Sequence, residues 1–182
     1  MLLCSESRIC GENVSDLTER AMKFAIFHHR SIDQRRKYSN EPYEVHPIAV
    51  AAIVRSVGGT DEMIAASFLH DSAEDTNATI DDILREFGPL VASYVDGLTN
   101  VATKSDGNRA ARRKINDTHT AIQCPEVKTI KLADCIHNVS DILKQDAKFA
   151  LVYLQEKRDL LPYLTEGDER LYIRLEAMLE EN

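Results

Sequence analysis

The segment His70-Asp71-Ser72-Ala73-Glu74-Asp75 places four ionisable side chains directly after a largely apolar stretch. In a helix, His70 and Glu74 lie one turn apart on one face, and Asp71 and Asp75 are related in the same way. An adjacent His and Asp can offer an imidazole nitrogen and a carboxylate oxygen to one cation, while carboxylates one turn later can position or deprotonate a water. The segment therefore indicates metal-assisted hydrolysis. The alternative interpretation of this segment is a solvated helix end with a histidine packed in the core.

Two residues elsewhere in the chain have the right chemistry to complete a ligand set. His46 directly precedes Pro47, where a helix is expected to begin, and Asp134 lies in an otherwise apolar helical run. A buried carboxylate without a partner is costly, so Asp134 needs a partner, and a metal ion would suffice. These two residues favour the metal interpretation over the solvated helix end.

The elements that position these residues are predicted to be helices throughout. Apolar residues recur at spacings of three and four, and sustained alternation is missing, which predicts an all-α fold. Helix boundaries are indicated by Pro47, by Gly58-Gly59 and by the capping-box pattern from Thr79 to Asp82. We expect an N-terminal extension over 1–14 and one helical domain over 15–182. Its helices, about nine in number, are expected at 15–30, 47–57, 61–75, 80–87, 89–99, 108–122, 126–144, 147–161 and 168–180.

Composition excludes several classes of protein. The chain has 182 residues with a formal net charge of −8, which opposes adhesion to nucleic acid or to an anionic membrane. A chain of this length can bury a core without disulfides or a structural metal, and its four cysteines form no C-x-x-C pair. The start of the chain lacks an apolar signal core, and no stretch is apolar for long enough to span a bilayer. We expect a cytoplasmic protein that binds neither nucleic acid nor membranes; the oligomeric state stays open.

Several blocks together resemble the HD-domain hydrolases of guanosine tetra- and pentaphosphate, the alarmones (p)ppGpp. The resemblance extends over about residues 17–163. It implies an all-α HD-domain fold. It also implies a stand-alone small alarmone hydrolase, because the chain ends where the long bifunctional enzymes begin their synthetase domain. The blocks are Arg35-Arg36-Lys37, Glu41-Pro42-Tyr43, His46-Pro47-Ile48-Ala49-Val50-Ala51, Leu69 to Thr76, Phe87-Gly88 and Lys131 to Asn138.

The resemblance implies a metal site and a catalytic pair. The residues at the family's ligand positions would bind one Mn²⁺ per chain through two imidazoles and two carboxylates. This ligand set would also accept Fe²⁺ or Zn²⁺. The family's acidic pair matches two neighbouring carboxylates, which we assign jointly to water activation. The implied ligands are His46, His70, Asp71 and Asp134, and the implied catalytic residues are Glu74 and Asp75.

A nucleotide with pyrophosphates at both ends is a polyanion, so an acidic protein must concentrate positive charge where it binds. Arg109 and Lys114 fit a solvated helix face nearly as well as a phosphate site, and a core tyrosine would equally explain Tyr153. The predicted substrate contacts are Arg36, Lys37, Arg112, Arg113, Lys131, Asn138 and Tyr153.

Three positions depart from the family pattern. Asn100 and Arg113 stand where lysines are expected, and Cys135 stands where a basic residue is common. The implied function is Mn²⁺-dependent removal of the 3′-pyrophosphate from ppGpp or pppGpp, which yields GDP or GTP and pyrophosphate. The departures leave open the same reaction on adenosine analogues. Another HD nucleotide phosphohydrolase and a non-catalytic alarmone-binding module are the further alternatives.

Overall fold

The computed structural model describes residues 16–37, 39–145 and 147–181, so the expected extension over 1–14 lies outside the described residues. Within these ranges the regular secondary structure is helical, apart from an isolated antiparallel bridge between Arg35 and Pro42. The all-α prediction is confirmed. Along the same ranges, no helix combines the length and apolar character needed to cross a membrane.

The helices follow one another closely along the chain. The described part contains nine α-helical segments; the predicted helix over 61–75 forms two of them, and the predicted helices over 80–87 and 89–99 form one. Two short 3-10 turns, η1 (Lys104–Asp106) and η2 (Leu161–Leu164), precede α6 and follow α8. The α-helices are α1 (Asp16–Ser31), α2 (Val45–Ser56), α3 (Asp61–Leu69), α4 (Ser72–Asp75), α5 (Ile80–Leu98), α6 (Arg109–Ala121), α7 (Pro125–Gln145), α8 (Ala147–Leu160) and α9 (Glu169–Glu180).

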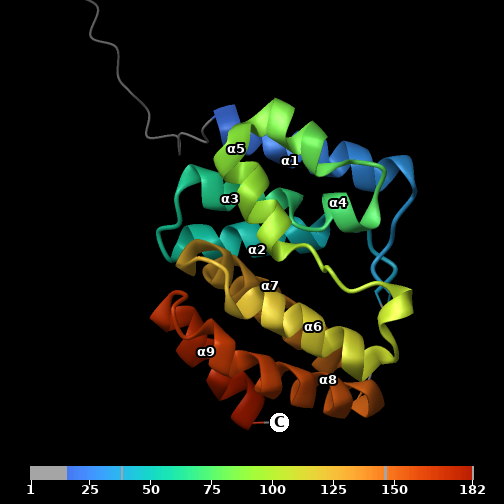
Figure 1. Cartoon of the computed structure of the whole chain (residues 1–182), viewed down its shortest axis with the longest axis vertical. Helices are drawn as coiled ribbons and strands as arrows, with labels where there is room; N and C mark the ends of the chain where they lie inside the picture. The colour runs from blue at the N-terminus through green and yellow to red at the C-terminus, as the bar shows by residue number, and fades with distance from the viewer. Residues whose placement is uncertain (1–15, 38, 146, 182) are drawn as a thin grey trace, which may run out of the picture.

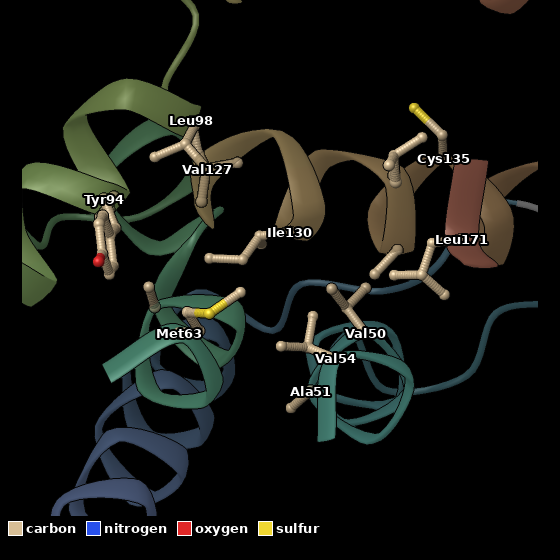
Figure 2. Close-up of a cluster of buried hydrophobic side chains, with 14 of the residues drawn as sticks. Val50, Ala51, Val54, Met63, Tyr94, Leu98, Val127, Ile130, Cys135 and Leu171 are labelled. Atoms are coloured by element: carbon tan, nitrogen blue, oxygen red, sulfur yellow. The ribbon is translucent and has the colours of Figure 1, made fainter. Parts of the chain in front are cut away.

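Helix α7 is the central element of the bundle. It packs against α2, α3 and α5 on one side and against α8 and α9 on the other, as Figure 1 shows. The core in Figure 2 joins Val50 of α2, Met63 of α3 and Leu98 of α5 to Ile130 of α7. Burial of these apolar side chains stabilises the bundle by about 25 cal/mol for each Å² removed from water. The packing fixes α2, α3 and α7 relative to one another.

Several local signals predicted from the sequence are confirmed. Thr79 accepts a hydrogen bond from the amide of Asp82, whose carboxylate accepts one from the amide of Thr79. Gly88, at φ 84°, divides α5 into the two expected halves, because this conformation is strained for residues with a Cβ. Gly58, at φ 77°, follows the end of α2.

The predicted start of α2 at Pro47 is wrong by two residues. The helix begins at Val45, and Pro47 is its third residue. Proline is tolerated there because the first amides of a helix have no partner within it. The earlier start places His46 inside the first turn of α2.

The single helix predicted over 61–75 is also wrong. Helix α3 ends at Leu69 and the short α4 begins at Ser72. His70 causes a local competition, because its Nδ1 lies 2.8 Å from the carbonyl oxygen of Ser67, to which it donates. This carbonyl would accept the amide of residue 71 in a continuous helix. The break turns His70 and the following carboxylate toward α2 and α7.

Candidate functional site

Three helices bring together the predicted metal ligands. His46 comes from the first turn of α2, His70 directly follows α3, and Asp134 lies in the middle of α7. Their exposed fractions are only 1%, 4% and 6%. One ligand atom from each lies within 4.8 Å of the others. The close packing of α2, α3 and α7 therefore creates a buried donor cluster.

Asp71 adds a fourth donor to this cluster. Its Oδ2 lies 3.0 Å from His70 Nε2 and 3.5 Å from His46 Nε2. The hydroxyl of Tyr43 donates to the same oxygen at 2.5 Å. Burial and the Asp71 carboxylate raise the pKa of Tyr43 strongly, so the hydroxyl keeps its proton and remains a donor. All four predicted ligands therefore converge.

The protonation pattern of the cluster fits a cation. Because His70 Nδ1 donates to the Ser67 carbonyl, its Nε2 carries the lone pair in the neutral ring, and it lies 3.2 Å from His46 Nε2. Two ring nitrogens and two carboxylates that face one small volume repel one another unless positive charge lies between them. Burial opposes protonation of His70, but Asp71 and Asp134 raise its pKa to about 9, so without a metal a proton on this ring supplies the positive charge that the carboxylates require. The residues fit a divalent metal ion, and His and carboxylate ligands suit Mn²⁺, Fe²⁺ and Zn²⁺.

Asp134 is oriented by its own helix. Lys131 Nζ lies 2.9 Å from Asp134 Oδ2, and Asn138 Nδ2 donates to Asp134 Oδ1 at 2.6 Å. Burial favours the neutral acid, but the Lys131 ammonium and the His46 ring hold the pKa of Asp134 well below its usual range. Arg36 in turn donates to Asn138 Oδ1 at 3.1 Å and to Asp141 at 2.6 Å. Arg36 therefore contacts the side chain of Asn138, which in turn contacts the predicted ligand Asp134.

His137, to which the sequence assigned no chemistry, contacts the predicted ligand His46. The Nδ1 atoms of the two rings lie 2.8 Å apart. Burial and the neighbouring His46 ring lower the pKa of His137 to about 4, so His137 is neutral and accepts from His46. This hydrogen bond directs the lone pair of His46 Nε2 toward the cluster.

We expect His137→Phe to weaken metal binding about 10- to 100-fold, because groups that orient a ligand affect metal affinity by this amount. Isothermal titration of the metal-free protein with Mn²⁺ measures the effect. The matched control is His119→Phe on α6, which makes the same replacement away from the cluster and should bind the metal normally. Equal affinities of the two variants would contradict an orienting role for His137.

The two acidic residues predicted to act jointly have different surroundings. Glu74 is exposed and accepts hydrogen bonds from the side-chain amide of Asn100 at 2.8 and 3.0 Å. Asp75, which is also exposed, accepts one from Gln34 Nε2 at 2.8 Å. The buried part of that side chain and the nearby Asp71 carboxylate raise the pKa of Asp75. The raised pKa means that Asp75 binds a proton more readily than an ordinary aspartate.

A cavity of about 250 Å³ adjoins the ligand cluster. Lys131 links the two, because it lines the cavity and also contacts Asp134. Five basic and two acidic side chains lie in the lining, which suits an anionic ligand. The lining residues are Asn100, Arg109, Arg112, Arg113, Asn116, Asp117, Thr120, Lys131, Tyr153, Glu156, Lys157 and Leu160.

The cavity brings together only some of the predicted substrate contacts. Arg112, Arg113, Lys131 and Tyr153 line it, whereas Arg36, Lys37 and Asn138 do not. Lys37 is exposed, with its ammonium 5.4 Å from the centre of the Phe149 ring.

Four residues of the site were missed as functional residues from the sequence. Lys157 lines the cavity, Tyr43 and His137 contact ligands, and Gln34 contacts Asp75. Lys157 follows Tyr153 by one helical turn, which is a signal that could have found it. The other three act across elements that are distant along the chain, and their spacing carries no such signal.

Comparison with known proteins agrees with this geometry. An HD domain family model matches residues 21–160. The guanosine-3′,5′-bis(diphosphate) 3′-pyrophosphohydrolase MESH1 of Homo sapiens is 33% identical over 135 residues, which cover 72% of each protein. The chain belongs to the HD-domain (p)ppGpp hydrolase family.

Other members of this HD-domain family differ in length. The probable guanosine-3′,5′-bis(diphosphate) 3′-pyrophosphohydrolase of Synechocystis is 38% identical over 123 residues, which cover 66% of this chain but only 16% of that protein. A solved structure described as a metazoan ortholog of SpoT that hydrolyzes ppGpp superimposes with a TM-score of 0.82 at 26% identity. The superposition covers 92% of this chain and 96% of that one.

Proposed function

We propose that this HD-domain chain removes the 3′-pyrophosphate from guanosine tetra- or pentaphosphate, leaving GDP or GTP and pyrophosphate. The observation that carries the proposal is the position of Lys131, which joins the four-donor cluster to the basic cavity. A polyanionic nucleotide in that cavity would have its phosphates beside the cluster. The names of the human and Synechocystis relatives support this substrate. Because the substrate is a free nucleotide, we place the activity in the cytoplasm.

The proposed cofactor is one Mn²⁺ per chain, held by His46, His70, Asp71 and Asp134. When bound there, a divalent cation supplies positive charge that acidifies a water and neutralises a phosphate oxygen. The ligand types support a divalent ion, and the choice of Mn²⁺ rests on the family resemblance.

Asp75 is the proposed general base. It accepts the proton of the attacking water, whose oxygen forms a bond to the phosphorus attached to the 3′ oxygen. The bond between that phosphorus and the 3′ oxygen breaks, the 3′ oxygen takes up a proton from solvent, and the nucleotide leaves with a 3′ hydroxyl. Asn100, which lines the cavity, donates to Glu74, and we assign Glu74 to orient the substrate or the water.

The basic lining of the cavity is proposed to bind the remaining phosphates. Lys131 and Lys157 lie on the α7 and α8 sides of the cavity, and Arg112 and Arg113 come from α6. The Arg113 guanidinium donates to Asp159 at 2.7 Å, while Arg112 donates to the carbonyl of Gly107 at 2.8 Å. A backbone carbonyl competes less strongly for a guanidinium than a carboxylate does. Arg112 is therefore the arginine best placed to turn to a phosphate.

A substrate panel tests the proposed reaction. The Mn²⁺-loaded protein is incubated with ppGpp, pppGpp and their adenosine counterparts, and the products are separated by anion-exchange chromatography. We expect pyrophosphate together with GDP or GTP. Faster release of pyrophosphate from the adenosine nucleotides would show that the site prefers adenine to guanine. Orthophosphate in place of pyrophosphate would indicate a different phosphohydrolase, and tight binding without any product would indicate a binding module.

We expect Arg112→Ala to raise KM about tenfold while kcat changes little, because attraction to the phosphates acts before as well as during the reaction. Steady-state kinetics at low and moderate salt measure both constants. Added salt should raise KM of the native chain more than KM of the variant, since exposed charges are screened over roughly 8–10 Å at physiological ionic strength.

The matched control for this charge removal is Lys114→Ala on the same helix. Lys114 is exposed and lies outside the cavity lining, so its loss should leave KM unchanged. Identical KM values and salt dependence for the native chain and Arg112→Ala would contradict the proposed phosphate contact.

A further inference from the structure

The connection between α1 and α2 carries a glutamine that faces the catalytic region. Gln34 Nε2 donates to Asp75 Oδ2 at 2.8 Å, and Gln34 Oε1 lies 2.6 Å from His29 Nδ1. The backbone of Gln34 is fixed as well: its amide donates to the carbonyl of His29 at 3.0 Å, and its carbonyl accepts from the amide of Tyr43 at 3.2 Å. Gln34 is thus held on both sides of its side chain and at both backbone groups.

His29 determines which way the Gln34 amide points. To donate to Gln34 Oε1, His29 must carry its proton on Nδ1. His29 is fully buried in α1, and its Nε2 has no hydrogen-bond partner among the described residues, which a ring nitrogen without a proton tolerates better than an N–H would. The reversed amide would place its oxygen against the Asp75 carboxylate. The protonation of His29 and the charge of Asp75 therefore select the same orientation of Gln34.

Asp75 needs such support because of its place in the fold. It is the last residue of α4, which has only four residues, and part of its side chain is exposed. The neighbouring Glu74 is held separately by Asn100, so it does not restrain Asp75. A carboxylate that must take a proton from a positioned water works best when its orientation is fixed before the reaction.

We propose that Gln34 is a positioning residue for Asp75, and that the buried His29 sets the orientation of the Gln34 amide. The proposal rests on the proposed function, in which Asp75 accepts the proton of the attacking water. Gln34 holds Oδ2 of the carboxylate and so fixes the direction in which the group accepts that proton. Within the described residues, the side-chain hydrogen bonds of Gln34 go to His29 and Asp75 rather than to a predicted metal ligand.

Two replacements of Gln34 separate positioning from simple structural support. Gln34→Leu loses both side-chain hydrogen bonds. Gln34→Glu keeps an acceptor for His29 Nδ1 but places a carboxylate against Asp75. If Gln34 positions Asp75, kcat falls about tenfold or more in both variants, while KM and Mn²⁺ content stay within about twofold of the native values. If Gln34 only supports His29 and the connection, Gln34→Glu keeps nearly native kcat, and the proposal is overturned.

A second measurement does not depend on activity. Melting temperatures are compared for Gln34→Leu, Asp75→Asn and the double variant, all loaded with metal. Residues in contact give non-additive shifts in melting temperature. We expect the melting temperature of the double variant to fall by less than the sum of the decreases in the two single variants. Additive shifts in melting temperature would contradict the proposed interaction between Gln34 and Asp75.

The kinetic outcomes also separate this proposal from the proposed function. A native chain that hydrolyses no alarmone would refute the reaction itself. An active native chain with an equally active Gln34→Glu variant would refute only the role of Gln34.

Discussion

Asp134→Ala and His70→Ala are each expected to remove the bound divalent metal and to reduce pyrophosphate release to background. Each replacement deletes one of four converging donors, and the remaining three cannot balance the geometry and charge of the site. Elemental analysis after gel filtration measures metal per chain, and circular dichroism verifies that the helical fold is retained.

The control for the ligand variants is a carboxylate on the same helix as Asp134. Glu126→Ala removes charge from the first turn of α7, away from the donor cluster, and should keep one metal per chain. Stoichiometric metal in Asp134→Ala or His70→Ala would refute the ligand set.

Asp75→Asn is expected to keep the metal and to lower kcat about 10²- to 10⁴-fold, the range over which general bases contribute. Asparagine preserves the size of the side chain but cannot accept the proton. A base works only when ionised, and the pKa of Asp75 is raised, so kcat of the native chain should fall on acidification at a pH above the ordinary aspartate range. Rate measurements across pH, made together with metal analysis, follow both effects.

Glu74→Gln provides the comparison for Asp75. The glutamine can still accept a hydrogen bond from Asn100, so we expect retained metal and a smaller loss of kcat. A larger loss in Glu74→Gln than in Asp75→Asn would exchange the roles proposed for the two carboxylates.

Much of the fold follows from local patterns in the sequence. The spacing of apolar residues predicted the helices, and Thr79, Asp82 and Gly88 marked boundaries through bonds and dihedral angles that depend on nearby residues. The break between α3 and α4 was missed because it depends on the side chain of His70, which competes with the backbone for the carbonyl of Ser67. Helix propensity and the spacing of apolar residues carry no signal for such a competition.

The candidate site was predictable to a smaller extent. His46, His70, Asp71 and Asp134 could be named from their chemistry and the family resemblance, and the packing of α2, α3 and α7 brings them together. The supporting contacts could not be named in the same way. Gln34 reaches Asp75 across 41 positions and His137 meets His46 across 91, so both contacts arise only from the tertiary arrangement.

The most direct test of the proposed reaction compares the native chain with Asp75→Asn at equal Mn²⁺ content, with ppGpp as substrate in ¹⁸O-labelled water. We expect the native chain to release GDP and pyrophosphate in equal amounts, with the label in the pyrophosphate because water attacks phosphorus, and Asp75→Asn to release almost none. Orthophosphate as the product, label in the nucleotide, or equal rates for the two proteins would contradict the mechanism.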